Sequence, residues 1–459
     1  MRALTEGMEV EALRGPRIVS GPPGPRSREL MELKDRYIAK GYYVNLPIFI
    51  KRGSGALIED VDGNVYIDFG SGIGVLNAGH SHPDIARAIS EQARMFSHAC
   101  FHITPYEGYL RVAERLIKAA PGPTPKKAIL VNSGAEAVEN SIKIAIYYSK
   151  RPALLAFENA FHGRTHLAAA LSSKVKPNKI GFGLAFDNIE RFPYAYCYRC
   201  AFGQTYPDCG LRCIGYIEDS FASRRAPEEV AAVIAEPIQG EGGIIVPPED
   251  FIRGLRRLCD RYGILFIADE IQTGLGRTGR MFACEHWSVI PDIMCIGKAI
   301  AGGIPMGVTV AKEEVMSSLK RGEHTSTFGG NPIACAAASA TLDIIVGERL
   351  PERASSLGQR LMKGLRALKE KHGSIREVRG MGLMIGVEMK HDVYNVIMKS
   401  LERGLLILDA GRNVLRFLPP LVIEETQLDR AIGILDEAIV DAALGGASDK
   451  VPDRSARDL

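Results

Sequence analysis

Short apolar runs alternate with stretches of helical periodicity between about residues 80 and 345. The runs KAILVN, PALLAF, AAVIAE, ILFIAD and MGVTVA each suit one strand, whereas FIRGLRRLCDRYG spaces its apolar residues like one helix face, at Phe251, Leu255, Leu258 and Tyr262. Strands that are apolar throughout are typical of a parallel sheet buried between helices. This region therefore predicts an α/β fold with a largely parallel sheet.

The sequence on either side has a different pattern. Residues 56–69 (ALIEDVDGNVYIDF) hold two alternating runs joined at Asp62-Gly63, which is the strongest short signal for a β-hairpin. After Gly347 come a charged helical stretch, strand-like runs in GLMIGVEM and VLRFLPPL, and a final amphipathic helix. Residues 21–28 (GPPGPRSR) are expected to form an extended arm rather than a helix, because of their prolines.

The length of the chain predicts more than one domain. A single hydrophobic core stops growing at about 250–300 residues, and this chain has 459. We expect a large domain over residues 80–345, a smaller domain over residues 346–459, and an N-terminal arm with part of the small domain over residues 1–79.

Charge and hydropathy exclude two classes of partner. The net charge is +3, without a long basic run, so nucleic acid is not expected. The first fifteen residues contain no apolar leader segment, and no stretch reaches the ~18 apolar residues of a membrane span. A cytoplasmic protein without a membrane partner is expected.

Three features could carry chemistry. In KAILVNSGAEA, a strand leads through Ser133 and Gly134 into a helix, whose free N–H groups could bind a phosphate, although such turns are also common without a ligand. Asp269 ends the apolar run ILFIAD, where a carboxylate needs a cation or simply caps a turn. Lys298 follows an apolar run, where desolvation would lower its pKa and favour a Schiff-base nucleophile over a solvated lysine.

Other motifs are less specific. Cys197, Cys200, Cys209 and Cys213 lie in one short segment that suits zinc, two disulfides or free thiols. The sequence GLGRTG (274–279) satisfies G-x-G-x-x-G but does not leave a strand, which argues against a dinucleotide site.

Seven motifs together resemble those of the class III pyridoxal-phosphate aminotransferases of fold type I, the group of the 4-aminobutyrate, acetylornithine and ornithine aminotransferases. They are SGAEA (133–137), FHGRT (161–165), AEPIQGEGG (235–243), ADEIQTGLGRTG (268–279), GKAIAGGIPMG (297–307), TSTFGGNP (325–332) and VLRFLPPL (414–421). The resemblance implies a large domain whose mostly parallel sheet is flanked by helices, and a small α+β domain built from both chain ends. His80 and His82 would then lie in a turn near a dimer interface rather than bind a metal.

The resemblance also implies roles for residues around pyridoxal 5′-phosphate. Lys298 would form the Schiff base, and Asp269 would keep the pyridine nitrogen protonated. The remaining cofactor residues would be Ser133, Gly134 and Ala135 at the phosphate, Phe161 stacked on the ring, Gln272 near the ring hydroxyl, His162, Glu236, and Thr327 reaching the phosphate of the other subunit. A homodimer or a dimer of dimers is therefore expected.

Four residues would contact the substrates. Arg416 resembles the arginine that holds the α-carboxylate, Glu241 the glutamate that pairs with it when the substrate lacks that group, and Arg164 the arginine for a distal carboxylate. Ile73 stands where ornithine aminotransferases carry tyrosine.

The activity that this implies is transfer of an amino group from an ω-amino or related amino acid, 4-aminobutyrate first among them, to 2-oxoglutarate. The alternatives are an ornithine or acetylornithine aminotransferase, an amino-acid racemase or epimerase that uses the same lysine, and a non-catalytic relative.

Overall fold

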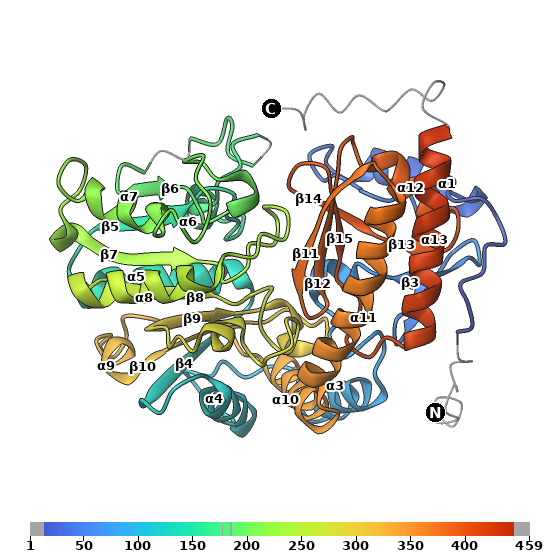
Figure 1. The fold of residues 1–459 in the computed structure, drawn as a ribbon. Coiled ribbons are helices and arrows are strands. Elements are labelled where there is room, and N and C mark those ends of the chain that lie inside the picture. Colours follow the sequence, from blue (N-terminus) through green and yellow to red (C-terminus); the bar gives the residue numbers. More distant parts are fainter. Residues whose placement is uncertain (1–12, 177, 184–185, 445–459) are drawn as a thin grey trace.

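A computed structural model describes residues 13–176, 178–183 and 186–444, and all elements below belong to this part of the chain. Its central feature is a seven-stranded sheet of order β4-β10-β9-β8-β7-β5-β6, seen at the left of Figure 1. All adjacent pairs are parallel except the two that involve β10. The strands are β4 (Lys126–Val131), β5 (Ala153–Phe157), β6 (Ile189–Phe192), β7 (Val230–Ala235), β8 (Leu265–Asp269), β9 (Ile293–Ile296) and β10 (Gly307–Lys312).

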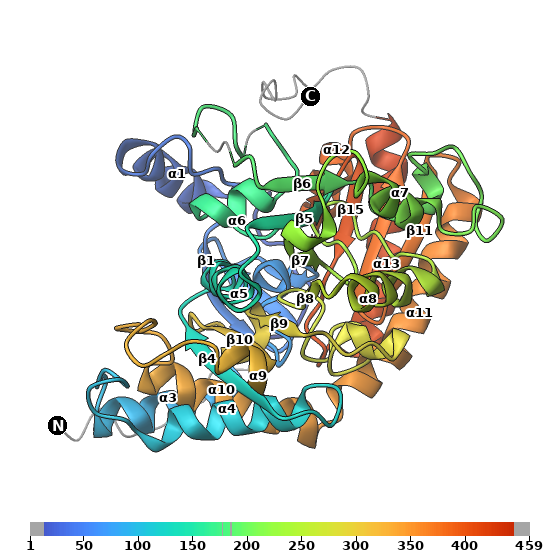
Figure 2. The ribbon, with the colours of Figure 1, turned by 90° about the vertical axis from the view of Figure 1, so that its left-hand side faces the viewer.

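Helices cover both faces of this sheet, as its apolar strands predict. Alternate residues of β5 pack into different clusters: Leu155 lies with Phe251 of α8 (Glu249–Tyr262), and Leu154 lies with Ile142 of α5 (Gly134–Ser149). Figure 2 shows α5 and α8 as separate helices beside the strands. The predicted fold type is confirmed.

Two smaller four-stranded sheets lie beside the large one. In the first, β13 from the C-terminal part pairs in parallel with β3, which joins the two chain ends, and the second is covered by helices at the right of Figure 1. The first sheet holds β1 (Ile50–Ser54), β2 (Leu57–Asp60), β3 (Val65–Asp68) and β13 (Leu405–Leu406). The second holds β11 (Ile375–Met381), β12 (Met384–Met389), β15 (Val414–Phe417) and β14 (Leu408–Ala410).

The remaining helices pack around these sheets. They are α1 (Pro25–Tyr37), α2 (Ser71–Gly74), α3 (Pro83–Met95), α4 (Glu107–Ala119), α6 (His166–Leu171), α7 (Arg212–Ser220), α9 (Glu313–Met316), α10 (Pro332–Gly347), α11 (Leu350–Lys371), α12 (Tyr394–Leu401), α13 (Glu425–Leu444) and the 3-10 turns η1 (Cys197–Arg199), η2 (Pro227–Glu229), η3 (Ala283–Trp287) and η4 (Lys298–Ala301). None of the helices in the described chain is long and apolar enough to cross a membrane.

Of two structural predictions for the N-terminal part, one is confirmed and the other is wrong in part. The hairpin at Asp62-Gly63 is confirmed, because β2 and β3 pair antiparallel across it. The extended arm over residues 21–28 is wrong in its second half, since α1 begins at Pro25. Proline suits the first helical position, where its missing N–H needs no partner. Residues 1–12, which include most of the segment without a leader pattern, lie outside the described residues, and the domain boundaries stay predictions.

Candidate active site

Lys298 is the first residue of η4, directly after Gly297 at the carboxyl end of β9. Its φ of 46° is left-handed, which a non-glycine residue adopts mainly where its surroundings impose it. Burial lowers the pKa of its amine to about 8, because a desolvated ammonium loses hydration. A substantial fraction of this amine is therefore neutral near physiological pH.

Four charged side chains act on this amine. Glu241 raises its pKa most among them, Arg416 lowers it, and Glu236 and Asp269 raise it. Asp269 ends β8 and Glu236 directly follows β7, so both lie at the same edge of the sheet as Lys298. The crevice at the carboxyl ends of parallel strands is the usual ligand site of such sheets.

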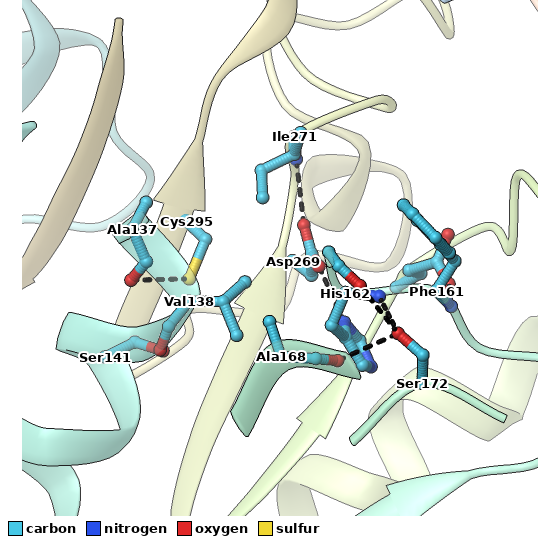
Figure 3. A network of polar contacts seen from close by, with 12 residues as sticks. Ala137, Val138, Ser141, Phe161, His162, Ala168, Ser172, Asp269, Ile271 and Cys295 are labelled. Atoms are coloured by element: carbon cyan, nitrogen blue, oxygen red, sulfur yellow. Dashed lines mark hydrogen bonds and ion pairs between the residues drawn. The ribbon is translucent and has the colours of Figure 1, made fainter. Parts of the chain in front are cut away.

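Asp269 is held by two donors in a buried position (Figure 3). The Nδ1 atom of His162 donates to its Oδ2 across 2.7 Å, and the backbone N–H of Ile271 donates to its Oδ1 across 3.1 Å. The His162 backbone N–H donates in turn to Ser172 Oγ, which fixes the imidazole segment. The Nε2 atom of His162 is buried and has no hydrogen-bond partner among the described residues.

Glu236 binds two backbone donors, the N–H groups of Phe161 and Gly240, each at 2.9 Å. Burial raises the pKa of its carboxyl to about 7, with Asp269 acting in the same direction and His162 against it. Two carboxyls and one imidazole thus share a buried pocket.

Gln272 stands beside this group with an unused acceptor. Its Oε1 is buried and lacks a partner in the part of the chain that the structure describes. A Cβ added to Gly240 would lie 2.1 Å from this oxygen, so a larger residue at position 240 would require the Gln272 side chain to move. Buried polar atoms without partners are rare in folded proteins and are often satisfied by a bound group.

The N-terminus of α5 carries free backbone donors, as the sequence predicts. The Ser133 hydroxyl accepts from the Glu136 N–H at 3.2 Å and caps the helix, while Glu136 Oε2 accepts from the Asn132 N–H at 2.8 Å. The N–H groups of Gly134 and Ala135 belong to the first turn, where no intrahelical acceptor exists. Such free N–H groups at a helix N-terminus are able to bind an anion.

Arg416 and Glu241 form an ion pair at 2.5 Å between Nη1 and Oε1. Burial alone would raise the pKa of Glu241, but Arg416, with smaller contributions from Lys298 and Arg164, holds it below its ordinary value. Arg416 lies in β15 and is 5% exposed, and its Nε has no partner within the described residues.

Two predicted residues lie further out. Arg164 is exposed and donates to Asn178 Oδ1 at 3.1 Å, although its charge still acts on Glu241. Thr327 is exposed in the loop before α10, and within the described chain it makes no hydrogen bond to the residues around Lys298.

Ile73 lies in an unusual turn. Ser71, Gly72, Ile73 and Gly74 have consecutive left-handed φ values of 47°, 61°, 70° and 72°. The Gly74 N–H donates to the Gly70 carbonyl at 2.9 Å, which closes one turn of left-handed helix. This conformation costs an L-residue other than glycine roughly 1–2 kcal/mol. A Cβ on Gly74 would lie 3.9 Å from Gln272 Cγ, so the turn borders the site.

The four clustered cysteines lie together in the structure. Cys197, Cys200, Cys209 and Cys213 line one small cavity of about 20 Å³, with all four as free thiols in the structure. No group of three or more His, Cys, Asp or Glu side chains in the described chain is arranged to hold a metal. Cys197 is close enough to Cys200 and Cys209 for their thiols to act on its pKa, so the choice among zinc, two disulfides and free thiols stays a prediction.

The remaining histidine and glycine motifs are structural. His80 Nε2 lies 2.7 Å from Asp68 Oδ2, and the His82 side chain caps α3. Residues 274–279 form turns and do not lead from a strand into a helix, which confirms that GLGRTG is not a dinucleotide motif.

Sequence reasoning missed Arg277, which is fully buried. Its guanidinium donates to the carbonyls of Leu383 and Pro419 and to Asn77 Oδ1, and burial lowers its pKa to about 9. It ties the loop after Gln272 to the segment after β15. Its position in the GLGRTG turn was the only available signal.

Comparisons with known proteins match almost the whole chain. A family model described as "Aminotransferase class-III" matches residues 37–439. The 4-aminobutyrate aminotransferase of Mycobacterium leprae is 42% identical over 442 residues, which cover 92% of this chain and 98% of that protein. The 5-aminovalerate aminotransferase of Pseudomonas aeruginosa is 39% identical, with 91% and 99% covered.

Among solved structures, an ornithine aminotransferase from Toxoplasma gondii superimposes with a TM-score of 0.82 at 31% identity, covering 91% of this chain and 95% of that one. That structure is described as having partial occupancy of PLP at its active site.

Proposed function

Because the chain belongs to the class-III aminotransferases, we propose that it moves the amino group of an ω-amino acid, 4-aminobutyrate first among them, to 2-oxoglutarate. The observation that carries this proposal is the Arg416–Glu241 pair beside Lys298. The pair would let one pocket accept two kinds of amine. Arg416 would bind the carboxylate of a substrate that has one beside the amine, and Glu241 would neutralise Arg416 when the substrate has none.

The residues present fit pyridoxal 5′-phosphate, which the family implies. The fit rests on the desolvated amine of Lys298, the buried carboxylate of Asp269, the free N–H groups at the start of α5 and the partnerless Oε1 of Gln272. Phe161 stands between Glu236 and Arg164, with the Arg164 guanidinium 5.8 Å from its ring centre. We assign the phosphate to Gly134 and Ala135, the pyridine nitrogen to Asp269, the ring face to Phe161 and the covalent anchor to Lys298.

The chemistry that this group supplies when bound is an electron sink for the carbon next to the transferred nitrogen. Once the substrate amine has displaced it, Lys298 Nζ would be free to remove the proton from the substrate carbon that bears the transferred nitrogen, a task that suits an amine of depressed pKa. The contact with His162 fixes the Asp269 carboxyl in place, where it would face the ring nitrogen and favour its protonated form. Asp269 and His162 are both buried.

Arg416 and Glu241 select between the two substrates. With 4-aminobutyrate, whose amine carbon has no carboxylate, Glu241 keeps the guanidinium neutralised. With 2-oxoglutarate, Glu241 must release Arg416 so that it can hold the α-carboxylate by a bidentate pair, while Arg164 takes the distal one. The exposed Arg164 suits a carboxylate that enters from solvent.

A donor panel tests the function. Purified holoenzyme is incubated with 2-oxoglutarate and each of 4-aminobutyrate, 5-aminovalerate, ornithine, acetylornithine and alanine, and glutamate formation is measured. We expect the two ω-amino acids without an α-carboxylate to react fastest. Ornithine faster than 4-aminobutyrate would contradict the donor assignment, and racemisation of alanine without any oxo acid would favour the racemase.

Two parts of the proposal concern the assembled protein. The exposed Thr327 suits a contact with the phosphate of a neighbouring subunit, which makes a homodimer the smallest complete enzyme. A Thr327→Val variant that keeps its dimer mass but binds the cofactor as tightly as the unchanged protein would refute this. Location in the cytoplasm stays a prediction from the sequence.

A further inference from the structure

We propose that Asp68 is a positioning residue for the substrate pocket, which holds the turn Ser71–Gly74 left-handed and thereby fixes Ile73 relative to Arg416. The inference rests on the proposed function, because Ile73 and Arg416 matter as two walls of the donor pocket. Asp68 is not one of the residues assigned above to the cofactor or the substrates.

Asp68 binds the turn through one carboxylate oxygen and is anchored through the other. It ends β3 and is 3% exposed. Its Oδ1 accepts from the backbone N–H groups of Gly70 at 2.7 Å and Ser71 at 2.9 Å. Its Oδ2 lies 2.7 Å from His80 Nε2, and the His80 backbone pairs in both directions with Gly55. The carboxylate is thus anchored to the first sheet on one side and to the turn on the other.

The turn is bonded directly to the segment that carries Arg416. The Ser71 hydroxyl donates to the Leu418 carbonyl at 2.6 Å, and the Leu418 N–H donates to the Phe69 carbonyl at 2.7 Å. Leu418 follows Arg416 by two residues. A change in the turn therefore acts on Arg416 through two short hydrogen bonds.

The turn requires the hydrogen bonds to Asp68 because its residues disfavour the left-handed conformation. Ser71 and Ile73 carry a Cβ in the left-handed region, where L-residues are disfavoured, and a β-branched residue there is a clear outlier. Strain of this kind persists only where the surroundings impose it. Loss of the two bonds to Asp68 would let the turn relax and move the Ile73 side chain, which is 44% exposed.

Kinetics of three variants test the proposal on the holoenzyme, with the best donor from the panel. Asp68→Ala and Ser71→Ala are expected to raise the KM for the donor about tenfold and about threefold, with kcat changed less than about threefold. Asp68→Asn keeps one oxygen for both N–H groups and should restore a KM within about twofold of the unchanged protein.

Asp60→Ala is the matched control. Asp60 Oδ1 also accepts from two backbone N–H groups, those of Asp62 and Asn64, both at 2.9 Å, but at the other end of β3. Asp60→Ala should lower the unfolding temperature and leave the donor KM unchanged. A KM that rises equally in Asp60→Ala and Asp68→Ala would overturn the proposal.

Amide hydrogen exchange of residues 69–76 gives a second measurement without any substrate. Asp68→Ala should accelerate exchange there about tenfold, and Asp68→Asn should not. Hydrogen exchange therefore tests whether Asp68 holds the turn even if the donor panel refutes the proposed function. Unchanged exchange and unchanged KM in Asp68→Ala would refute the inference. Ser71→Ala supplies both measurements if Asp68→Ala does not fold.

Discussion

His162 Nδ1 lies 2.7 Å from Asp269 Oδ2, and both side chains are almost entirely buried. This contact sets the environment of the carboxylate that we assign to the ring nitrogen. Since His162 holds this buried carboxyl in place, loss of His162 should weaken cofactor binding.

The first prediction concerns this contact. His162→Ala should weaken pyridoxal phosphate binding about tenfold or more, because a charge-assisted hydrogen bond is lost. His162→Asn, whose amide can donate from a similar position, should recover most of the affinity. Titration of cofactor-free protein, followed by the visible band of the bound cofactor, measures both. Equal affinities in all three proteins would contradict the role.

The second prediction concerns the Lys298 amine. Because burial lowers its pKa to about 8, the neutral nucleophilic fraction in cofactor-free protein should rise as the pH passes through about 8. The rate of cofactor incorporation should follow this rise at fixed cofactor concentration. Lys298→Ala should form no band that borohydride removes. A rate still climbing towards pH 10.5, the ordinary value, would show that the amine is solvated.

The third prediction separates the two half-reactions. Glu241→Gln leaves Arg416 without its counter-charge, so the half-reaction with 4-aminobutyrate should slow about tenfold or more, while glutamate should react at a nearly unchanged rate. Arg416→Lys should reverse this pattern, because lysine cannot form the bidentate pair. Stopped-flow spectra of each half-reaction check this, and equal slowing of both would refute the switch.

The fourth prediction concerns the pH dependence of stability. Burial raises the pKa of Glu236 to about 7 from 4.5, so between these values the folded chain holds a proton that the unfolded chain has lost. The contribution to stability is full below pH 4.5 and falls as the pH rises through 7. Thermal unfolding of cofactor-free Glu236→Gln should lack this decline. Glu228→Gln, at an exposed position, should keep it.

The fifth prediction concerns Arg277. Arg277→Met should destabilise the protein by roughly 3–5 kcal/mol, since three buried acceptors lose their donor. Arg353→Met removes donors from the carbonyls of Leu421 and Ile423 closer to the surface and should have a smaller effect. Denaturant unfolding measures both, and equal losses would mean that the burial of Arg277 is unimportant.

Local patterns predicted the parts of the site that depend on one segment. Asp269 closes an apolar run and Ser133 opens a helical one, so their places at strand and helix ends follow from periodicity alone. Lys298 follows an apolar strand in the same way. The arrangement of Arg416 against Glu241 required the resemblance, because the two lie far apart in the chain.

Some local conformations and the burial of one charged residue depend on tertiary packing, so the sequence pattern did not predict them. Nothing in SGIG marks Ile73 as left-handed, since isoleucine disfavours that region, and the turn is held by bonds to the distant Leu418 as well as to Asp68. Arg277 is charged, and its burial depends on acceptors 106 and 142 residues further along the chain. Proline was interpreted as a helix breaker, but at Pro25 it occupies the first position of α1, where it is favourable.

The pairing of β4 with β10 can form only late in protein synthesis. The partner of Lys126–Val131 is Gly307–Lys312, so an emerging polypeptide carries the first strand unpaired while the next 175 residues are translated. Arg416 leaves the ribosome later still. The helix N-terminus to which we assign the phosphate is therefore synthesised long before Arg416, so the proposed cofactor site and the proposed substrate site can be completed only after β10 and β15 have both emerged.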